Sequence, residues 1–89
     1  MDKIKDEIIT TLTMQGINLD STIEYEVNKK PYTLSYRFII DSYMQGSDEA
    51  KLVFLTALKK SQSAGEMGIE KFFEGMGQLL LMGSLSKKL

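Results

Sequence analysis

The sequence predicts a small α+β domain that is mainly helical, with the order α-β-β-α-α-α and one short β-hairpin packed on a small helical bundle. Two observations lead to this prediction. Apolar residues recur at helical spacing in four segments, whereas they alternate with polar residues in residues 22–34. The 89 residues correspond to one domain, residues 1–89, and a hydrophobic share of 43% is enough for a single core.

Residues 2–15 are predicted to form the first helix. Ile4, Ile8 and Leu12 recur every four residues and therefore share one face of a helix. Gly16 follows them, and glycine readily adopts the left-handed conformation that ends many helices. We therefore expect an amphipathic helix whose apolar face joins the core.

Residues 22–34 are predicted to form a β-hairpin, in which 22–27 pairs with 32–34. The apolar positions that alternate in its first strand are Ile23, Tyr25 and Val27. A period of two is typical of a strand with one buried face. Residues 28–31 are expected to form the turn, because asparagine tolerates left-handed backbone and proline cannot donate a ladder hydrogen bond. A helix over residues 20–30 is the alternative, and it would place the central tyrosine off the apolar face.

From Tyr36 the period changes to that of a helix. The apolar stripe of this second helix consists of Tyr36, Ile39, Ile40, Tyr43 and Met44. Ser35 or Thr33 is a suitable N-cap for it, and Gly46 is a suitable residue to end it. A strand that continues through Ile40 is the alternative, but the helical stripe followed by a glycine favours the helix.

A third helix is predicted after Ser47, whose hydroxyl suits an N-cap. Its first turn is acidic and its last turn is basic, as the helix dipole favours. These charged residues are Asp48, Glu49, Lys59 and Lys60. The inward face is predicted to consist of Val53, Phe54, Ala57 and Leu58. Leu52 and Leu55 fall outside that face.

The C-terminal helix is predicted from Glu66 to Gly83, with a frayed tail over residues 84–89. Its core stripe consists of Ile69, Phe72, Phe73, Met76, Leu79 and Leu80. Leu81 and Met82 lie outside this stripe, so the last turn is apolar almost all round. Such a turn is covered either by the rest of the domain or by a partner.

Two further features lie beside that core stripe. Gly68 and Gly75 are seven residues apart, and we expect them to let another backbone come close. The acidic ridge formed by Glu66, Glu70 and Glu74 is interpreted as a solvated face. It does not resemble a metal site, because Ca²⁺ and Mg²⁺ usually take oxygen ligands from loops or from several elements.

The composition argues against an enzyme. There is no cysteine and no histidine, so thiolate chemistry is excluded and the commonest general base and zinc ligand are missing. No glycine-rich nucleotide-binding loop occurs between a strand and a helix, and there is no EF-hand loop. We therefore expect no catalytic residues, no cofactor and no bound metal.

The sequence also predicts a cytoplasmic protein that does not act at a membrane. Charged residues interrupt the N-terminal segment, unlike the apolar region of a signal peptide. The longest apolar run, residues 79–82, is far shorter than the roughly 20 residues that span a bilayer. The absence of cysteine fits a reducing compartment.

The leading functional hypothesis is a non-catalytic regulatory module that binds another protein and self-associates, with a dimer as the expected homo-oligomer. Three helices carry more apolar positions than a single core-facing stripe uses. Contiguous exposed apolar surface of this kind marks partner sites in many proteins. The candidate partner and oligomer surface comprises Phe38, Leu52, Leu55, Leu81 and Met82.

Two alternatives stay open. A small nucleic-acid-associated regulator would use the lysine pairs together with the tyrosines. Its candidate patch comprises Lys29, Lys30, Lys59 and Lys60. A net charge of −1 offers no general attraction for phosphates, so nucleic acid is the less favoured partner. The other alternative is an inhibitor of the type that phages and mobile elements encode, which rests on small size and the lack of motifs.

Overall fold

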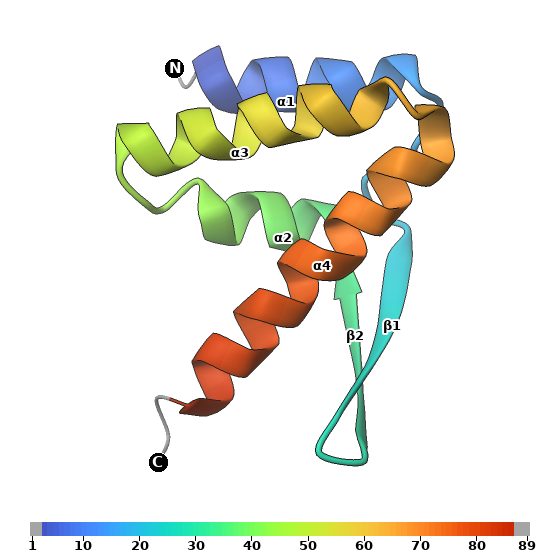
Figure 1. Cartoon of the computed structure of the whole chain (residues 1–89), viewed down its shortest axis with the longest axis vertical. Helices are drawn as coiled ribbons and strands as arrows, with labels where there is room; N and C mark the ends of the chain where they lie inside the picture. Colours follow the sequence, from blue (N-terminus) through green and yellow to red (C-terminus); the bar gives the residue numbers. More distant parts are fainter. Residues whose placement is uncertain (1–2, 87–89) are drawn as a thin grey trace.

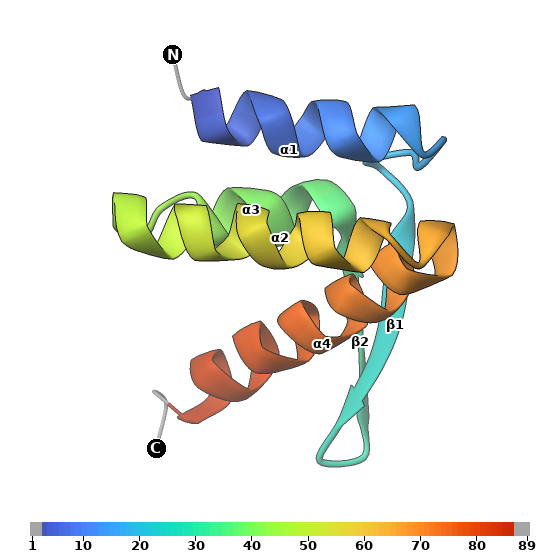
Figure 2. The same cartoon turned by 45° about the horizontal axis from the view of Figure 1, so that its top comes forward.

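The computed structural model describes residues 3–86, and side chains over residues 3–83, and it confirms the predicted order of elements (Figures 1 and 2). The elements are α1 (Lys3–Met14), β1 (Thr22–Val27), β2 (Lys30–Ser35), α2 (Tyr36–Tyr43), α3 (Asp48–Gln62) and α4 (Gly65–Ser86). The two strands form an antiparallel sheet. The fold is therefore mainly helical α+β, with one hairpin.

The helices form a small bundle with the hairpin at its side. Helix α3 packs against α1 and against α4, while α2 contacts α3 and α4. Figure 1 shows α4 crossing obliquely away from the end of α3, and its last turns extend beyond the other helices. The hairpin contacts α4 through β1, and its tip projects away from α1 and α3 in both views (Figures 1 and 2).

The core lies where the four helices meet. Its fully buried side chains are Ile8, Leu12, Ile39, Ile40, Phe54, Leu58, Ile69 and Phe73. Phe54 is central among the aromatic residues, since its ring lies 5.0 Å from that of Tyr43 and 5.1 Å from that of Phe72. Each helix therefore contributes apolar residues to the core, although α3 and the end of α4 differ from the prediction.

The predicted serine N-caps and the glycine that ends α1 are confirmed, whereas α2 ends at Tyr43, before the predicted Gly46, with Met44 as its C-cap. The backbone N–H of Phe38 donates to Ser35 Oγ at 3.0 Å, and that of Ala50 donates to Ser47 Oγ at 3.2 Å. These bonds satisfy N–H groups that the first helical turn leaves without a partner. Gly16 has a φ of 76°, the left-handed conformation expected after α1.

The hairpin is confirmed, but its turn is shorter than predicted. The turn consists of Asn28 and Lys29, with φ values of 53° and 65°. Lys30 and Pro31 belong to β2, where they pair with Val27 and Glu26. A two-residue turn with positive φ at both positions matches the twist of the paired strands. Pro31 is tolerated because β2 is an edge strand.

The predicted inward face of α3 is wrong at two positions. Val53, predicted to point inward, is 68% exposed, while Leu55, predicted as part of the partner surface, is 7% exposed and belongs to the core. The helix has apolar residues on both sides of Phe54, so periodicity alone does not select the buried side. Packing against both α1 and α4 turns the side with Leu55 inward.

Helix α4 is longer than predicted. It begins at Gly65 and continues to Ser86, so it includes three residues of the segment that was assigned to the tail, and residues 87–89 lie outside the described residues. Leu79, predicted in the core stripe, is exposed. The reason is that the last turns of α4 extend past the bundle that covers its first half (Figure 1).

Candidate interaction surface

The outward face of α3 carries an apolar hollow, which we call the α3 hollow. It has a volume of about 330 Å³ and is lined by Leu52, Val53, Thr56, Ala57 and Lys60. Leu52 is 51% exposed and Val53 is 68% exposed. Two large aliphatic side chains therefore stand in solvent next to each other on one helix.

Helical geometry explains why these residues share one face. They follow the spacing i, i+1, i+4, i+5 and i+8, which keeps them on one side of a helix. The opposite side of α3 holds the buried Phe54, Leu55 and Leu58. Thr56 and Ala57 are the smaller residues of the lining and lie one turn after Leu52 and Val53.

The two ends of the α3 face have opposite charges. Asp48 and Glu49 lie in the first turn, and Lys59 and Lys60 lie in the last. Lys59 forms an ion pair with Glu7 of α1, which fixes its ammonium group beside that helix. Lys60 lines the hollow itself. The apolar face is thus bounded by an acidic end and a basic end.

The structure places the five residues predicted as a partner surface on three different helices. Leu52 lines the α3 hollow, whereas Leu55 is buried beneath it. Phe38 is exposed on α2, Met82 is exposed on α4, and Leu81 of α4 is half-buried. Val53, which was predicted to lie on the inward face of α3, is exposed beside Leu52 in the α3 hollow.

The four lysines of the alternative nucleic-acid patch lie in two separate places. Lys29 and Lys30 are at the hairpin tip, while Lys59 and Lys60 are in the last turn of α3. In Figures 1 and 2 the hairpin tip projects away from α3. The ion pair between Lys59 and Glu7 further reduces the charge that is available to a phosphate.

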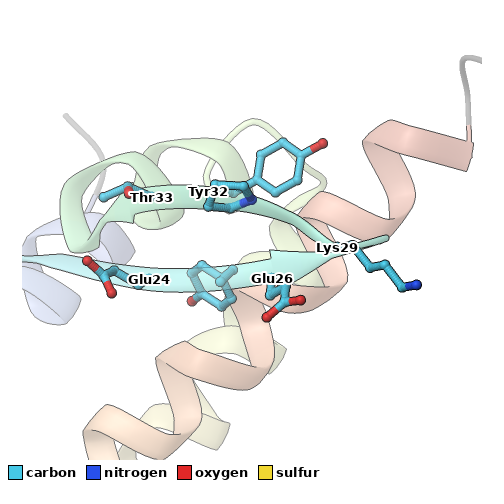
Figure 3. Close-up of a pocket in the computed structure, with 7 residues that line it drawn as sticks. Glu24, Glu26, Lys29, Tyr32 and Thr33 are labelled. Carbon is cyan, nitrogen blue, oxygen red and sulfur yellow. The ribbon is translucent and has the colours of Figure 1, made fainter.

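The hairpin carries an open hollow of about 570 Å³ (Figure 3). Glu24 and Glu26 extend from one strand, Tyr32 and Thr33 extend from the other, and Lys29 projects from the turn. These side chains point in different directions in Figure 3 rather than toward a common point. General acid–base catalysis needs groups held within hydrogen-bond reach of one substrate, so this arrangement does not favour it.

The acidic ridge of α4 lies beside a buried tyrosine. Glu70 and Glu74 line a shallow hollow together with Tyr36, Thr22 and Ile23. Burial raises the pKa of Tyr36, and the charges of Glu70 and Glu74 raise that pKa further. A phenol of this kind keeps its proton at neutral pH and does not act as a base. Within residues 3–86, no group of three or more acidic residues is placed to hold a metal ion.

Tyr25 attaches the hairpin to α4. Its hydroxyl donates a hydrogen bond of 2.8 Å to the backbone carbonyl of Phe73, and its side chain is buried. Burial, followed by the nearby charge of Glu74, raises the pKa of Tyr25 from 10.0 to about 12. The folded protein therefore holds this proton more tightly than the unfolded chain does.

This difference predicts a loss of stability at alkaline pH. The contribution of Tyr25 is fully present below pH 10 and is lost as the pH rises to about 12, because the unfolded chain releases the proton first. We expect the free energy of unfolding, measured with urea between about pH 8 and 12, to fall more steeply for the wild type than for Tyr25→Phe. Tyr36 and Tyr43 are present in both proteins, so the difference between the two slopes reports Tyr25 and its electrostatic interaction with these two residues. Equal slopes would show that Tyr25 does not hold its proton in the folded state.

Known protein families, curated proteins and solved structures provide no match to this chain. In the part of the chain that the structure describes, no helix is long and apolar enough to cross a membrane. A functional proposal for this protein therefore rests on its own surface, where the α3 hollow combines exposed apolar side chains with charged ends.

Proposed function

We propose that this protein is a non-catalytic regulatory module of the cytoplasm that binds protein chains, including its own, through the α3 hollow. The observation that supports the proposal is the exposure of Leu52 and Val53 side by side in one hollow. Contact with a partner would remove this apolar surface from water, which is the main favourable term in most protein association.

The shape of the hollow favours a helix or another convex protein element as its ligand. It is an open depression along a helix rather than an enclosed cavity, and small-molecule sites bury most of their ligand's surface. The small residues Thr56 and Ala57 allow a partner element to come close to the α3 backbone. No observation gives comparable support to the nucleic-acid alternative, because its lysine pairs are far apart.

The test is a comparison of two glutamate substitutions at exposed apolar positions. Val53→Glu places a carboxylate in the α3 hollow, whereas Met67→Glu changes a side chain of similar exposure, 70%, at the start of α4. We expect Val53→Glu to raise the dissociation constant for self-association at least about tenfold, because burying an unpaired charge is costly. Met67→Glu should leave it unchanged. Sedimentation velocity over a concentration series measures both.

A third variant distinguishes the α3 hollow from the exposed end of α4. If Met82→Glu abolished association while Val53→Glu did not, the binding surface would lie on α4 and the proposal would be wrong. Thermal unfolding of each variant provides the control for folding. Since Val53 and Met82 are both exposed, we expect melting temperatures close to that of the wild type.

A further inference from the structure

We propose that the occupant of the α3 hollow is a second copy of this chain, with the two α3 helices packed antiparallel about a two-fold axis. This inference rests on the proposed function and specifies the partner and the geometry of the same face. Two independent features of α3 lead to it: the placement of its charges and the placement of its large and small residues.

The charges favour an antiparallel arrangement. Glu49 and Lys60 are eleven positions apart, about three helical turns, so both lie along the same line on α3. Both side chains are exposed, and within the described residues no ion pair joins either one to another side chain. Antiparallel packing places Glu49 of each copy beside Lys60 of the other. Parallel packing would instead place like charges together, which is unfavourable.

The apolar residues fit the same two-fold axis. The midpoint between positions 49 and 60 lies between positions 54 and 55 of α3. The midpoint between positions 53 and 56 lies at the same place. The axis that pairs the charges therefore also brings Val53 of one copy to Thr56 of the other. In this arrangement the apolar lining of one α3 hollow covers that of the other. Leu52 of each copy then lies level with Ala57 of the other.

The resulting interface is isologous, meaning that the same surface is used by both copies. A contact made by one helix from each copy is at the small end of specific protein interfaces, and such contacts are weak and reversible. We therefore expect a dimer whose dissociation constant lies on the order of micromolar. Reversible dimerisation would cover or expose the α3 hollow according to the concentration of the protein.

Charge reversal tests this geometry directly. In a dimer of Glu49→Lys, the lysine at position 49 of each copy faces Lys60 of the other. In a dimer of Lys60→Glu, the glutamate at position 60 of each copy faces Glu49 of the other. Each single variant should therefore dimerise at least about tenfold more weakly than the wild type. An equimolar mixture of the two variants restores both opposite-charge pairs. We expect the mixture to form a heterodimer with an affinity within about threefold of the wild type, and the double variant Glu49→Lys/Lys60→Glu to recover similarly.

The comparison between each variant alone and the mixture controls for effects on folding, because the same two proteins are present in both experiments. Lys71→Glu, at an exposed position of α4, makes the same charge change as Lys60→Glu outside the proposed interface and should not weaken dimerisation. Sedimentation equilibrium with a fluorescent label on one variant separates the heterodimer from homodimers.

The outcomes distinguish this inference from the function on which it rests. If Val53→Glu weakens association but the mixture of charge variants recovers nothing, the α3 hollow is an interface without the antiparallel geometry, and this inference alone is wrong. If neither Val53→Glu nor the charge variants affect association, both the inference and the proposed function are wrong. A wild-type protein that stays monomeric up to about 0.5 mM would rule out the second copy as the partner.

Discussion

Replacement of Phe54 by alanine is expected to lower the free energy of unfolding by about 3–5 kcal/mol, as buried phenylalanines do when they are truncated. Phe54 is 1% exposed, and its ring lies 5.0 Å from Tyr43, 5.1 Å from Phe72 and 5.9 Å from Phe73. The substitution therefore opens a cavity at the contact between three helices. A domain of this length has a total stability of roughly 4–13 kcal/mol, so the loss is a large share of it.

Two further variants, a milder change at Phe54 and a control at its neighbour, test the prediction even if Phe54→Ala does not fold. Phe54→Leu keeps most of the volume and should cost about 1–2 kcal/mol. Val53→Ala, at the exposed neighbouring position, should change stability by no more than about 0.5 kcal/mol. Urea unfolding at a concentration where the protein is monomeric measures all three. A loss below about 1 kcal/mol for Phe54→Ala would contradict the central position of this ring.

Alanine substitutions at two neighbouring glycines of α4 are expected to have opposite effects. A Cβ atom at Gly77 would lie 2.0 Å from Tyr25 Oη and 2.5 Å from its Cζ, so the tyrosine ring would have to move and lose its bond to the carbonyl of Phe73. Overpacking of this kind costs about 1–3 kcal/mol. At Gly75 no atom lies within 4 Å of the added Cβ. Gly75→Ala should therefore stabilise the helix by about 0.5–1 kcal/mol.

The comparison is made by urea unfolding, and the two glycines serve as matched controls because they lie in the same helix. The same substitution in a Tyr25→Val protein tests whether the clash with the tyrosine ring is the cause. Without the ring, Gly77→Ala should no longer destabilise the protein, because the two effects are coupled through one contact. Stabilisation by Gly77→Ala equal to that by Gly75→Ala would show that the ring does not occupy this position.

Local sequence patterns were sufficient to predict every helix and both strands. Alternation in β1, the helical stripe after Ser35 and the N-cap serines each depend on residues within one or two turns, and the structure has the corresponding elements. The length of the hairpin turn could not be predicted from the local sequence. Its two-residue length depends on left-handed backbone at Lys29 as well as Asn28, and lysine gives no sequence signal for that conformation.

Tertiary contacts could not be predicted in the same way. Gly68 was expected to allow a close approach, and it does: an added Cβ would lie 2.4 Å from the carbonyl oxygen of Ser61. The same expectation at Gly75 is wrong, and Gly77 contacts Tyr25 instead. The contact joins residues more than fifty positions apart, and the period of one helix contains no information about which strand packs on it.

The candidate site was only partly visible in the sequence for the same reason. The acidic and basic ends of α3 and the exposure of Leu52 could be inferred from the residues of that helix alone. Which flank of Phe54 faces the core depends on the combined packing of α1 and α4, and this decided that Val53 is exposed and Leu55 is buried. The α3 hollow therefore became apparent only in the fold.

The central claim is that the outward face of α3 is the surface through which this protein binds another chain. The most direct measurement is a dilution series of amide ¹H–¹⁵N NMR spectra of the wild-type protein, because it locates the surface without any substitution. We predict that the concentration-dependent shifts cluster in residues 49–60. Shifts that cluster in the hairpin or in the last turns of α4, or spectra that do not change on dilution from about 0.5 mM, would contradict the claim.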